Sequence, residues 1–170
     1  MKIQFILSHI GNWFKGRSGK TITRGYFHRT AVKGDTALGE GNYFHNHYVQ
    51  ASFYAVIDLL GIVIKSVFAT DTEYALNQQF ENQISVNIEF TGLQGTALTS
   101  KQTAAAIAFI TSDPAFRAIA NRRLSLKQIR GQKVSGWGNH ADVTHAYKIY
   151  GGHTDGISEA EIAQILARIR

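Results

Sequence analysis

The sequence predicts an α/β protein, in which a single domain has a central mixed β-sheet flanked by α-helices. The chain has 170 residues, and 44% of them are hydrophobic, which is enough for one compact core. Short segments rich in β-branched and aromatic residues recur along the chain and predict strands. Between and after them lie alanine-rich or isoleucine-rich segments that begin with typical helix N-cap residues.

The first elements follow from local composition. Residues 1–21 combine a short apolar start with several glycines, so we expect an N-terminal arm laid over the domain, which itself spans residues 22–170. A strand is predicted at 22–30, where β-branched and aromatic residues cluster. A helix is predicted at 36–47, although two glycines lower its helix propensity.

The middle of the chain predicts three strands. Residues 51–57 and 62–68 are mostly apolar and are separated by a turn at 59–61, which indicates a hairpin. Residues 84–91 alternate Ile, Val, Ile and Phe with polar residues, a pattern typical of a strand with one polar face. Together with the strand at 22–30, these segments predict a sheet of four or more strands.

The last part of the chain predicts helices and one loop. Thr99 is expected to cap an alanine-rich helix at 100–111, and Asp113 to begin a second helix with the only proline in its first turn. Residues 131–138 contain three glycines and predict a loop. Ser158 precedes a final helix whose isoleucines and leucine recur at helical spacing.

Composition excludes several classes of protein. Without cysteine the chain has no disulfide, thiolate nucleophile, Cys-rich zinc module or iron–sulfur cluster, so a metal site must use histidines and carboxylates. No apolar segment approaches the ~20 residues that cross a bilayer, and we expect no transmembrane segment. The apolar run at 3–7 is also shorter than the ~7–15-residue core of a secretory signal.

Charge is unevenly distributed along the chain. The net charge is +6, with seven basic residues and no acid in 1–34, seven acids against one lysine in 35–89, and six basic residues in 114–141. A polyanionic partner would fit this pattern, either nucleic acid or an anionic cell wall or membrane surface, and so would plain solvation of helix faces. Aromatic residues do not interleave with the basic run at 117–133, which argues against a base-stacking surface.

Histidines are the first candidates for chemistry. The chain has seven, at positions 9, 28, 45, 47, 140, 145 and 153. A catalytic zinc needs about three protein ligands and an open position. His45 with His47, and His153 with Asp155, are each two residues apart, and the His-Glu-Xaa-Xaa-His motif of metalloproteases is absent.

Five short motifs occur in a characteristic order. They are Gly-Tyr-Phe-His-Arg-Thr at 25–30, Ser-Phe-Tyr-Ala-Val-Ile-Asp at 52–58, Asn-Gln-Ile-Ser-Val-Asn-Ile-Glu at 82–89, Leu-Thr-Ser-Lys-Gln at 98–102, and Asn-His-Ala-Asp-Val at 139–143 followed by His-Thr-Asp-Gly at 153–156. In this order they resemble the zinc-dependent N-acetylmuramoyl-L-alanine amidases of the type-2 amidase and peptidoglycan recognition protein fold, especially phage endolysins. The resemblance covers residues 21–170.

The resemblance implies a zinc site and a set of roles. It implies that Zn2+ is bound by His28, His140 and Asp155, which are ligand types that leave one tetrahedral position open for water. It places Glu89 as the general base for that water. His153 stands where the family has Lys or His, and is expected to stabilise the oxyanion or to replace Asp155 as a ligand.

Further residues are expected near the site. Tyr54 occupies the position of a polar aromatic residue in the family and is a secondary catalytic candidate. Tyr74, Asn82 and Asn87 are expected to contact the substrate. Trp13 and Trp137 are expected, with Tyr74, to line a groove for sugar or peptide, the alternative being that these aromatic residues belong to the core. His45 and His47 are expected to border the cleft without binding metal.

The sequence departs from the family pattern at several positions. The proline that follows the last ligand is replaced by Gly156, and the small residue before Ile-Glu is replaced by Asn87. A histidine at position 153 makes the oxyanion role sensitive to pH, because histidine becomes charged near pH ~6.5.

Taken together, these features predict a hydrolase that cleaves the amide between N-acetylmuramic acid and the L-alanine of the peptidoglycan stem peptide. The expected setting is phage or prophage lysis, with the protein made in the bacterial cytoplasm without a signal peptide and acting on the cell wall after release. Nucleic acid is not expected as the partner, and a monomer is favoured. Two alternatives are a non-catalytic peptidoglycan-binding module of the same fold and a basic nucleic-acid-binding domain.

Overall fold

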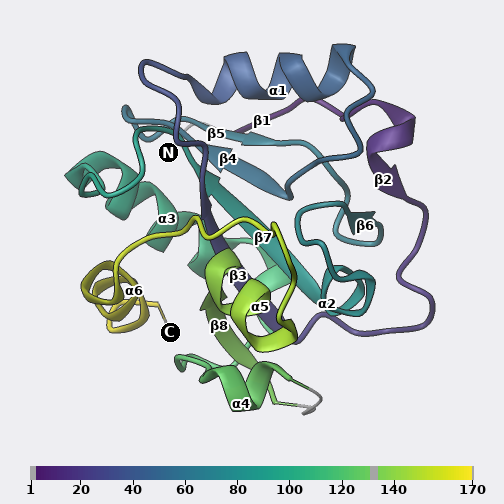
Figure 1. Cartoon of the computed structure of the whole chain (residues 1–170). Coiled ribbons are helices and arrows are strands. Elements are labelled where there is room, and N and C mark those ends of the chain that lie inside the picture. Colours follow the sequence, from purple (N-terminus) through teal and green to yellow (C-terminus); the bar gives the residue numbers. More distant parts are fainter. Residues whose placement is uncertain (1–2, 131–133, 170) are drawn as a thin grey trace.

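A six-stranded mixed sheet runs through the computed structural model, which describes residues 3–130 and 134–169 (Figure 1). The strand order is β1-β5-β4-β7-β3-β8. The β4–β5 pair is antiparallel and every other pair in this sheet is parallel. The strands are β1 (Ile3–Phe5), β3 (Arg24–Arg29), β4 (Ala55–Ile57), β5 (Val63–Lys65), β7 (Ser85–Phe90) and β8 (Gly136–Asn139).

Helices cover both faces of this sheet, so the predicted α/β class is confirmed. One face packs against α3 (Ser100–Ser112) and α6 (Glu159–Leu166), and the other against α1 (Ala37–Asn46) and α5 (His140–Tyr147). The remaining helices are α2 (Gln79–Ile84), α4 (Leu126–Ile129) and the 3₁₀ turns η1 (Ile10–Asn12) and η2 (Pro114–Phe116). None of the helices in the described part of the chain is long and apolar enough to cross a membrane.

The larger core lies under α3 and α6. It contains Phe27 and Ile88 from the central strands together with Phe109 of α3 and Ile162 of α6, all almost completely buried. Complete capping boxes at Thr99 and Ser158 begin these two helices, as the sequence predicts. The start of each helix is therefore set by local sequence, and its orientation by the apolar face that it buries.

The N-terminal residues take part in both sheets. Strand β1 pairs with β5 at the edge of the main sheet, and β2 (Trp13–Phe14) forms a small antiparallel sheet with β6 (Thr72–Glu73). Arg17 is buried, and its guanidinium donates to backbone carbonyls of the segments before β6 and around β7.

Two segments differ from the sequence prediction. The prediction of a loop at 131–138 is wrong for residues 136–138, because β8 begins at Gly136. Residues 131–133 lie outside the described residues. Glycine suits β8 because a Cβ at Gly138 would lie 2.9 Å from the ring of Tyr26 on the neighbouring strand. The helix expected from Asp113 is only the turn η2.

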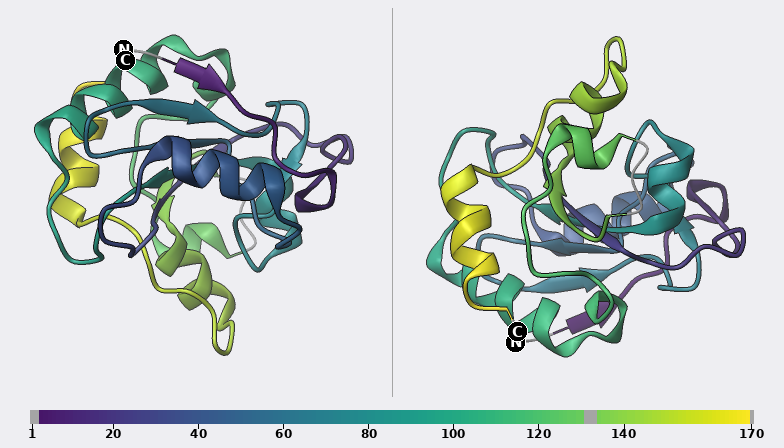
Figure 2. Two further views of the ribbon diagram at one scale, coloured as in Figure 1. Left: turned by 90° about the horizontal axis from the view of Figure 1, so that it is seen from above. Right: turned by 90° about the horizontal axis from the view of Figure 1, so that it is seen from below.

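The connection after α5 projects from the body of the molecule (Figure 2). Lys148 ends the helix in the left-handed conformation, with φ of 53°. The chain then returns to the sheet through residues 151–156. This segment places Asp155, a predicted metal ligand, on the face that carries α1 and α5.

Candidate metal centre

A cavity of about 700 Å³ opens on the sheet face that carries α1 and α5. Its floor comes from the ends of β3 and β7, and its walls from α1, the segment before β4, the start of α5 and the segment before α6. The predicted residues that line it are His28, Tyr74, Glu89, His140, His153 and Asp155.

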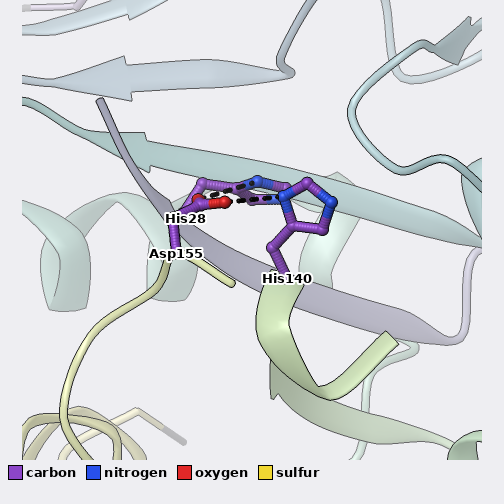
Figure 3. Close-up of side chains that lie close together, drawn as sticks. All are labelled: His28, His140 and Asp155. Carbon is purple, nitrogen blue, oxygen red and sulfur yellow. Dashed lines mark ion pairs between the residues drawn. The ribbon is translucent and has the colours of Figure 1, made fainter. Parts of the chain in front are cut away.

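Three of these residues form a compact cluster. The ligand atoms of His28, His140 and Asp155 all lie within 4.8 Å of one another (Figure 3). Nδ1 of His140 is 2.9 Å from Oδ1 of Asp155, and Nδ1 of His28 is 3.5 Å from Oδ2. The structure thus brings together the three predicted ligands from positions far apart in the sequence.

Local structure positions each member of the cluster. His28 alternates with Phe27 along β3, so its ring enters the cavity while Phe27 enters the core. His140 is the first residue of α5, where Asp142 Oδ2 accepts a hydrogen bond of 2.6 Å from the Asn139 N–H. Asp155 Oδ2 accepts a bond of 3.0 Å from the backbone N–H of Arg29.

The segment that carries Asp155 is fastened to the start of α5. The side chain of Asn139 donates to the carbonyl of Ile157 at 2.8 Å and accepts from its N–H at 3.1 Å. Gly156 lies against this side chain with φ of 152°, and a Cβ there would be 2.5 Å from Asn139 Cγ. A close approach and an unusual backbone conformation therefore require glycine where the family pattern has proline.

Electrostatics favours a neutral His140 and an ionised Asp155. Burial lowers the pKa of His140, the neighbouring His28 lowers it further, and Asp155 only partly opposes them. Burial would raise the pKa of Asp155, but hydrogen bonds and positive charge from His140 and His28 outweigh it and hold this pKa well below its usual range. Neutral imidazole and ionised carboxylate are the forms that bind divalent cations.

The donor set matches zinc. Two imidazole nitrogens and one carboxylate oxygen are the donor types of open, catalytic zinc sites, in which a fourth position is left for water or substrate. Softer thiolate ligands are absent from the chain, and an all-oxygen set typical of calcium or magnesium is not formed by this cluster. The residues present therefore fit a zinc ion held by His28, His140 and Asp155.

Glu89 lies next to the cluster. It pairs with His28 in the β3–β7 register, lines the cavity and is only 2% exposed. Its Oε1 atom has no hydrogen-bond partner within the described residues. Burial raises the pKa of Glu89 well above its usual value, and the charges of Asp155 and Glu40 add to this effect. A buried carboxyl group that has an unpaired oxygen and lies beside a candidate metal site is suited to proton transfer.

His153 lies at the rim of the same cavity. Its ring stacks against that of His140, with 5.5 Å between the ring centroids, and its side chain is exposed. Within the described residues the group that could hold a metal ion includes Asp155 and not His153. His153 therefore stands beside the cluster, where its ring nitrogens remain available to a ligand in the cavity.

Tyr54 is not brought to the site. Its ring packs against Phe109 and Phe116 on the opposite side of the sheet, and its hydroxyl donates to Asp113 Oδ1 at 2.8 Å. Strand β4 begins only at Ala55, so the face of Tyr54 could not be extrapolated from strand alternation. Phe53 lies in the cavity wall instead, with its ring centroid 5.0 Å from that of His28.

The two asparagines expected to contact substrate do not line the main cavity. Asn82 donates to the carbonyl of Leu76 at 2.7 Å and accepts from its N–H at 2.9 Å, so it fastens the loop before α2. Asn87 is completely buried, and its Oδ1 lies 2.8 Å from Nε2 of His28. Asn82 lines a separate, smaller cavity, and neither asparagine lines the cavity that contains His28, His140 and Asp155.

Other residues expected near the site are accounted for elsewhere. Trp137 is stacked on Phe27 in the core, and Trp13 donates to the carbonyl of Ser8. His45 and His47 are exposed, and neither lines the cavity. The sequence analysis missed two residues that line the cavity, Glu40 of α1 and Phe53 of the irregular segment before β4. Neither position has a spacing pattern that would have indicated it.

Comparison with known proteins supports the fold. The chain resembles the structure of Staphylococcus aureus hydrolase AmiA with a TM-score of 0.68 at 17% identity, over 99% of this chain and 82% of that one. The N-acetylmuramoyl-L-alanine amidase endolysin LysCS of Clostridium intestinale is similar with a TM-score of 0.61 at 12% identity, over 99% and 97% of the two chains. The catalytic domain of XlyA gives 0.62 at 15% identity, over 97% and 99%.

These neighbours define the fold class. The chain has the fold of N-acetylmuramoyl-L-alanine amidases and endolysins, as the order of its motifs predicted. No protein-family model matches the sequence, and no curated protein matches it. The fold is thus recognised through structure at identities where the sequences have largely diverged.

Proposed function

We propose that this chain is a zinc-dependent N-acetylmuramoyl-L-alanine amidase that hydrolyses the bond between N-acetylmuramic acid and L-alanine in peptidoglycan. The observation that carries the proposal is the His28–His140–Asp155 cluster next to Glu89 in one open cavity. The fold shared with peptidoglycan amidases and endolysins supports the same substrate. Lysis of a bacterial wall by a phage or prophage product is the setting we propose.

The chain's own residues divide the work as follows. His28, His140 and Asp155 hold the metal, which when bound polarises a carbonyl oxygen and lowers the pKa of water. Glu89, ionised when the charge of a bound metal opposes the effect of burial on its pKa, accepts the proton of the attacking water and delivers it to the departing amine. His153, exposed at the rim, donates a hydrogen bond to the carbonyl oxygen as negative charge develops there.

The experiment uses purified peptidoglycan and the zinc-loaded protein. We expect about one zinc per chain, and chelator-sensitive release of stem peptides with free L-alanine amino termini. Glu89→Gln should lower kcat by about 10²- to 10⁴-fold while zinc stays bound, because only the proton acceptor is lost. The control Glu159→Gln changes an exposed glutamate outside the cavity and should keep full activity.

Other outcomes would identify the alternatives. Wall binding without any cleavage would contradict the amidase and indicate a peptidoglycan-binding module. Full activity of Asp155→Ala would contradict the ligand assignment. Absence of zinc, combined with binding to nucleic acid that weakens steeply with salt, would favour the basic nucleic-acid-binding domain.

A further inference from the structure

A chain of buried polar groups extends from His28 away from the cavity. Nε2 of His28, the ring nitrogen that does not face Asp155, lies 2.8 Å from Oδ1 of Asn87. Asn87 is 0% exposed, and Glu73 behind it is also 0% exposed. The contacts of Asn87 with His28 and Glu73 are therefore shielded from bulk solvent, and protein atoms determine the partners of its amide.

The neighbours of Asn87 determine which way its amide points. Nδ2 donates to Glu73 Oε1 at 3.1 Å and to Ser85 Oγ at 3.2 Å, and the backbone N–H of Asn87 donates to the same Glu73 oxygen at 3.1 Å. The backbone N–H of Asn87 already donates to Glu73 Oε1, so this oxygen acts as an acceptor in either charge state of Glu73, and a flipped amide would place a second acceptor oxygen against it. Oδ1 must therefore face His28, and because a carbonyl oxygen only accepts, Nε2 of His28 must carry the hydrogen.

Glu73 is itself held in place. It lies on β6, with Oε1 4.0 Å from Nη2 of Arg17. The guanidinium of Arg17 donates to four backbone carbonyls, those of Ala69, Asn82, Gln83 and Ser85. Arg17 thus joins two segments of the backbone, at Ala69 and at 82–85, beside the end of the polar chain. The side chain of Asn87 cannot reorient without losing its contacts with Glu73, Ser85 and His28.

We propose that Asn87, held by Glu73, is a positioning residue that keeps the hydrogen of His28 on Nε2 and thereby presents Nδ1 to the metal. The proposal rests on the proposed zinc site. It replaces the expected substrate contact of Asn87 by a role that acts only through His28. Metal-binding histidines generally donate their second ring N–H to such a partner, and losing the partner typically weakens metal binding by about 10- to 100-fold.

The first experiment measures the hydrogen position directly in the metal-free protein. Long-range ¹H–¹⁵N correlation spectra, with the His28 signals assigned by comparison with His28→Gln, should show hydrogen on Nε2 of His28. In Asn87→Leu, which has no acceptor, the same signals should shift to a mixture of both tautomers. A hydrogen on Nδ1 in the wild type would overturn the proposal.

The second experiment measures zinc affinity by competition with a chromogenic chelator. Asn87→Leu should bind zinc about 10- to 100-fold more weakly. Asn87→Asp keeps the size of the side chain and an acceptor for Nε2 of His28, so it should bind zinc more tightly than Asn87→Leu. Ser66→Ala is the matched control, because Ser66 is buried outside this polar chain and its hydroxyl has no partner within the described residues, and it should bind zinc like the wild type.

The outcomes separate this proposal from the proposed function. Unchanged zinc affinity in Asn87→Leu, or equal zinc affinities of folded Asn87→Asp and Asn87→Leu, would overturn the positioning role. Melting temperatures of the metal-free proteins identify variants that fail to fold, and the tautomer of the wild type then decides. A wild type that shows hydrogen on Nε2 but binds no zinc would leave Asn87 positioning His28 and would refute the metal site.

Discussion

At the scale of single residues, two buried glutamates near the site differ in their partners. Oε1 of Glu73 accepts two hydrogen bonds from Asn87 and lies near Arg17. One oxygen of each glutamate, Oε2 of Glu73 and Oε1 of Glu89, has no partner within the described residues, but only Glu89 lines the cavity with His28. Glu73 is therefore part of the framework, and Glu89 is available to the cavity. The difference lies in the neighbours, since burial is nearly the same for both.

The pKa of Glu73 leads to a prediction about stability. Burial raises this pKa to about 8, despite the opposing charge of Arg17. The folded protein then holds a proton that the unfolded chain releases near pH ~4.5, so the free energy of unfolding decreases as pH rises from 4.5 through 8. Glu73→Gln removes this titration. Between pH 4.5 and pH 8 the free energy of unfolding of this variant should therefore fall by about one to a few kcal/mol less than that of the wild type.

Urea denaturation of the metal-free proteins between pH 5 and pH 8 measures this effect. Glu159→Gln is the control, because Glu159 is exposed and pairs with Arg123 at the surface. Its stability should follow the pH dependence of the wild type. Parallel curves for the wild type and Glu73→Gln would show that Glu73 does not titrate as proposed.

At the scale of elements, the central strands approach closely because small residues face large ones. Gly25 on β3 lies beside the ring of Trp137 on β8, and a Cβ at position 25 would be 2.3 Å from this ring. Trp137 is 1% exposed and is stacked between Phe27 and Phe116, so it has no room to move. The β3–β8 pairing also holds His28 opposite the start of α5.

Gly25→Ala should therefore destabilise the protein by about 1–3 kcal/mol, as expected for overpacking of a filled core. Gly39→Ala is the matched control, because the nearest atom to a Cβ there is the Thr36 hydroxyl at 3.1 Å and alanine favours the α1 helix. Chemical denaturation measures both variants. Equal stability of Gly25→Ala and the wild type would mean that Trp137 can shift.

At the scale of the whole molecule, the candidate metal centre joins segments that are distant in sequence. His28 comes from β3, His140 from the start of α5, and Asp155 from the segment before α6. A ligand that binds all three favours only the folded chain, in which they meet. Metal binding should therefore stabilise the entire fold.

Zinc at about 100-fold over its dissociation constant should add about 2.7 kcal/mol to the stability. For a chain of this length, the melting temperature should rise by about 5–10 °C and fall again with a chelator. Asp155→Ala should lose most of this response, and Glu159→Gln should keep it. A wild type whose melting temperature ignores zinc would refute binding at this cluster.

Elements with local signals could be predicted from the amino-acid sequence alone. The apolar alternation around Glu89 predicted β7, the capping residues Thr99 and Ser158 predicted the starts of α3 and α6, and the order of histidine and aspartate motifs predicted the three cluster residues. These signals depend on neighbours within a few residues or on an ordered set of short motifs. Both kinds of signal can be read along the chain without knowledge of which distant residues meet in the fold.

The remaining features depend on contacts that exist only in the folded chain. The glycine-rich segment at Gly136 becomes a strand because β3 lies beside it, and Tyr54 faces the opposite side of the sheet from the cavity because the backbone is irregular before β4. Asn87 contacts His28 because β3 and β7 are parallel and in register. Such contacts join residues far apart in sequence, so local composition carries no signal of them.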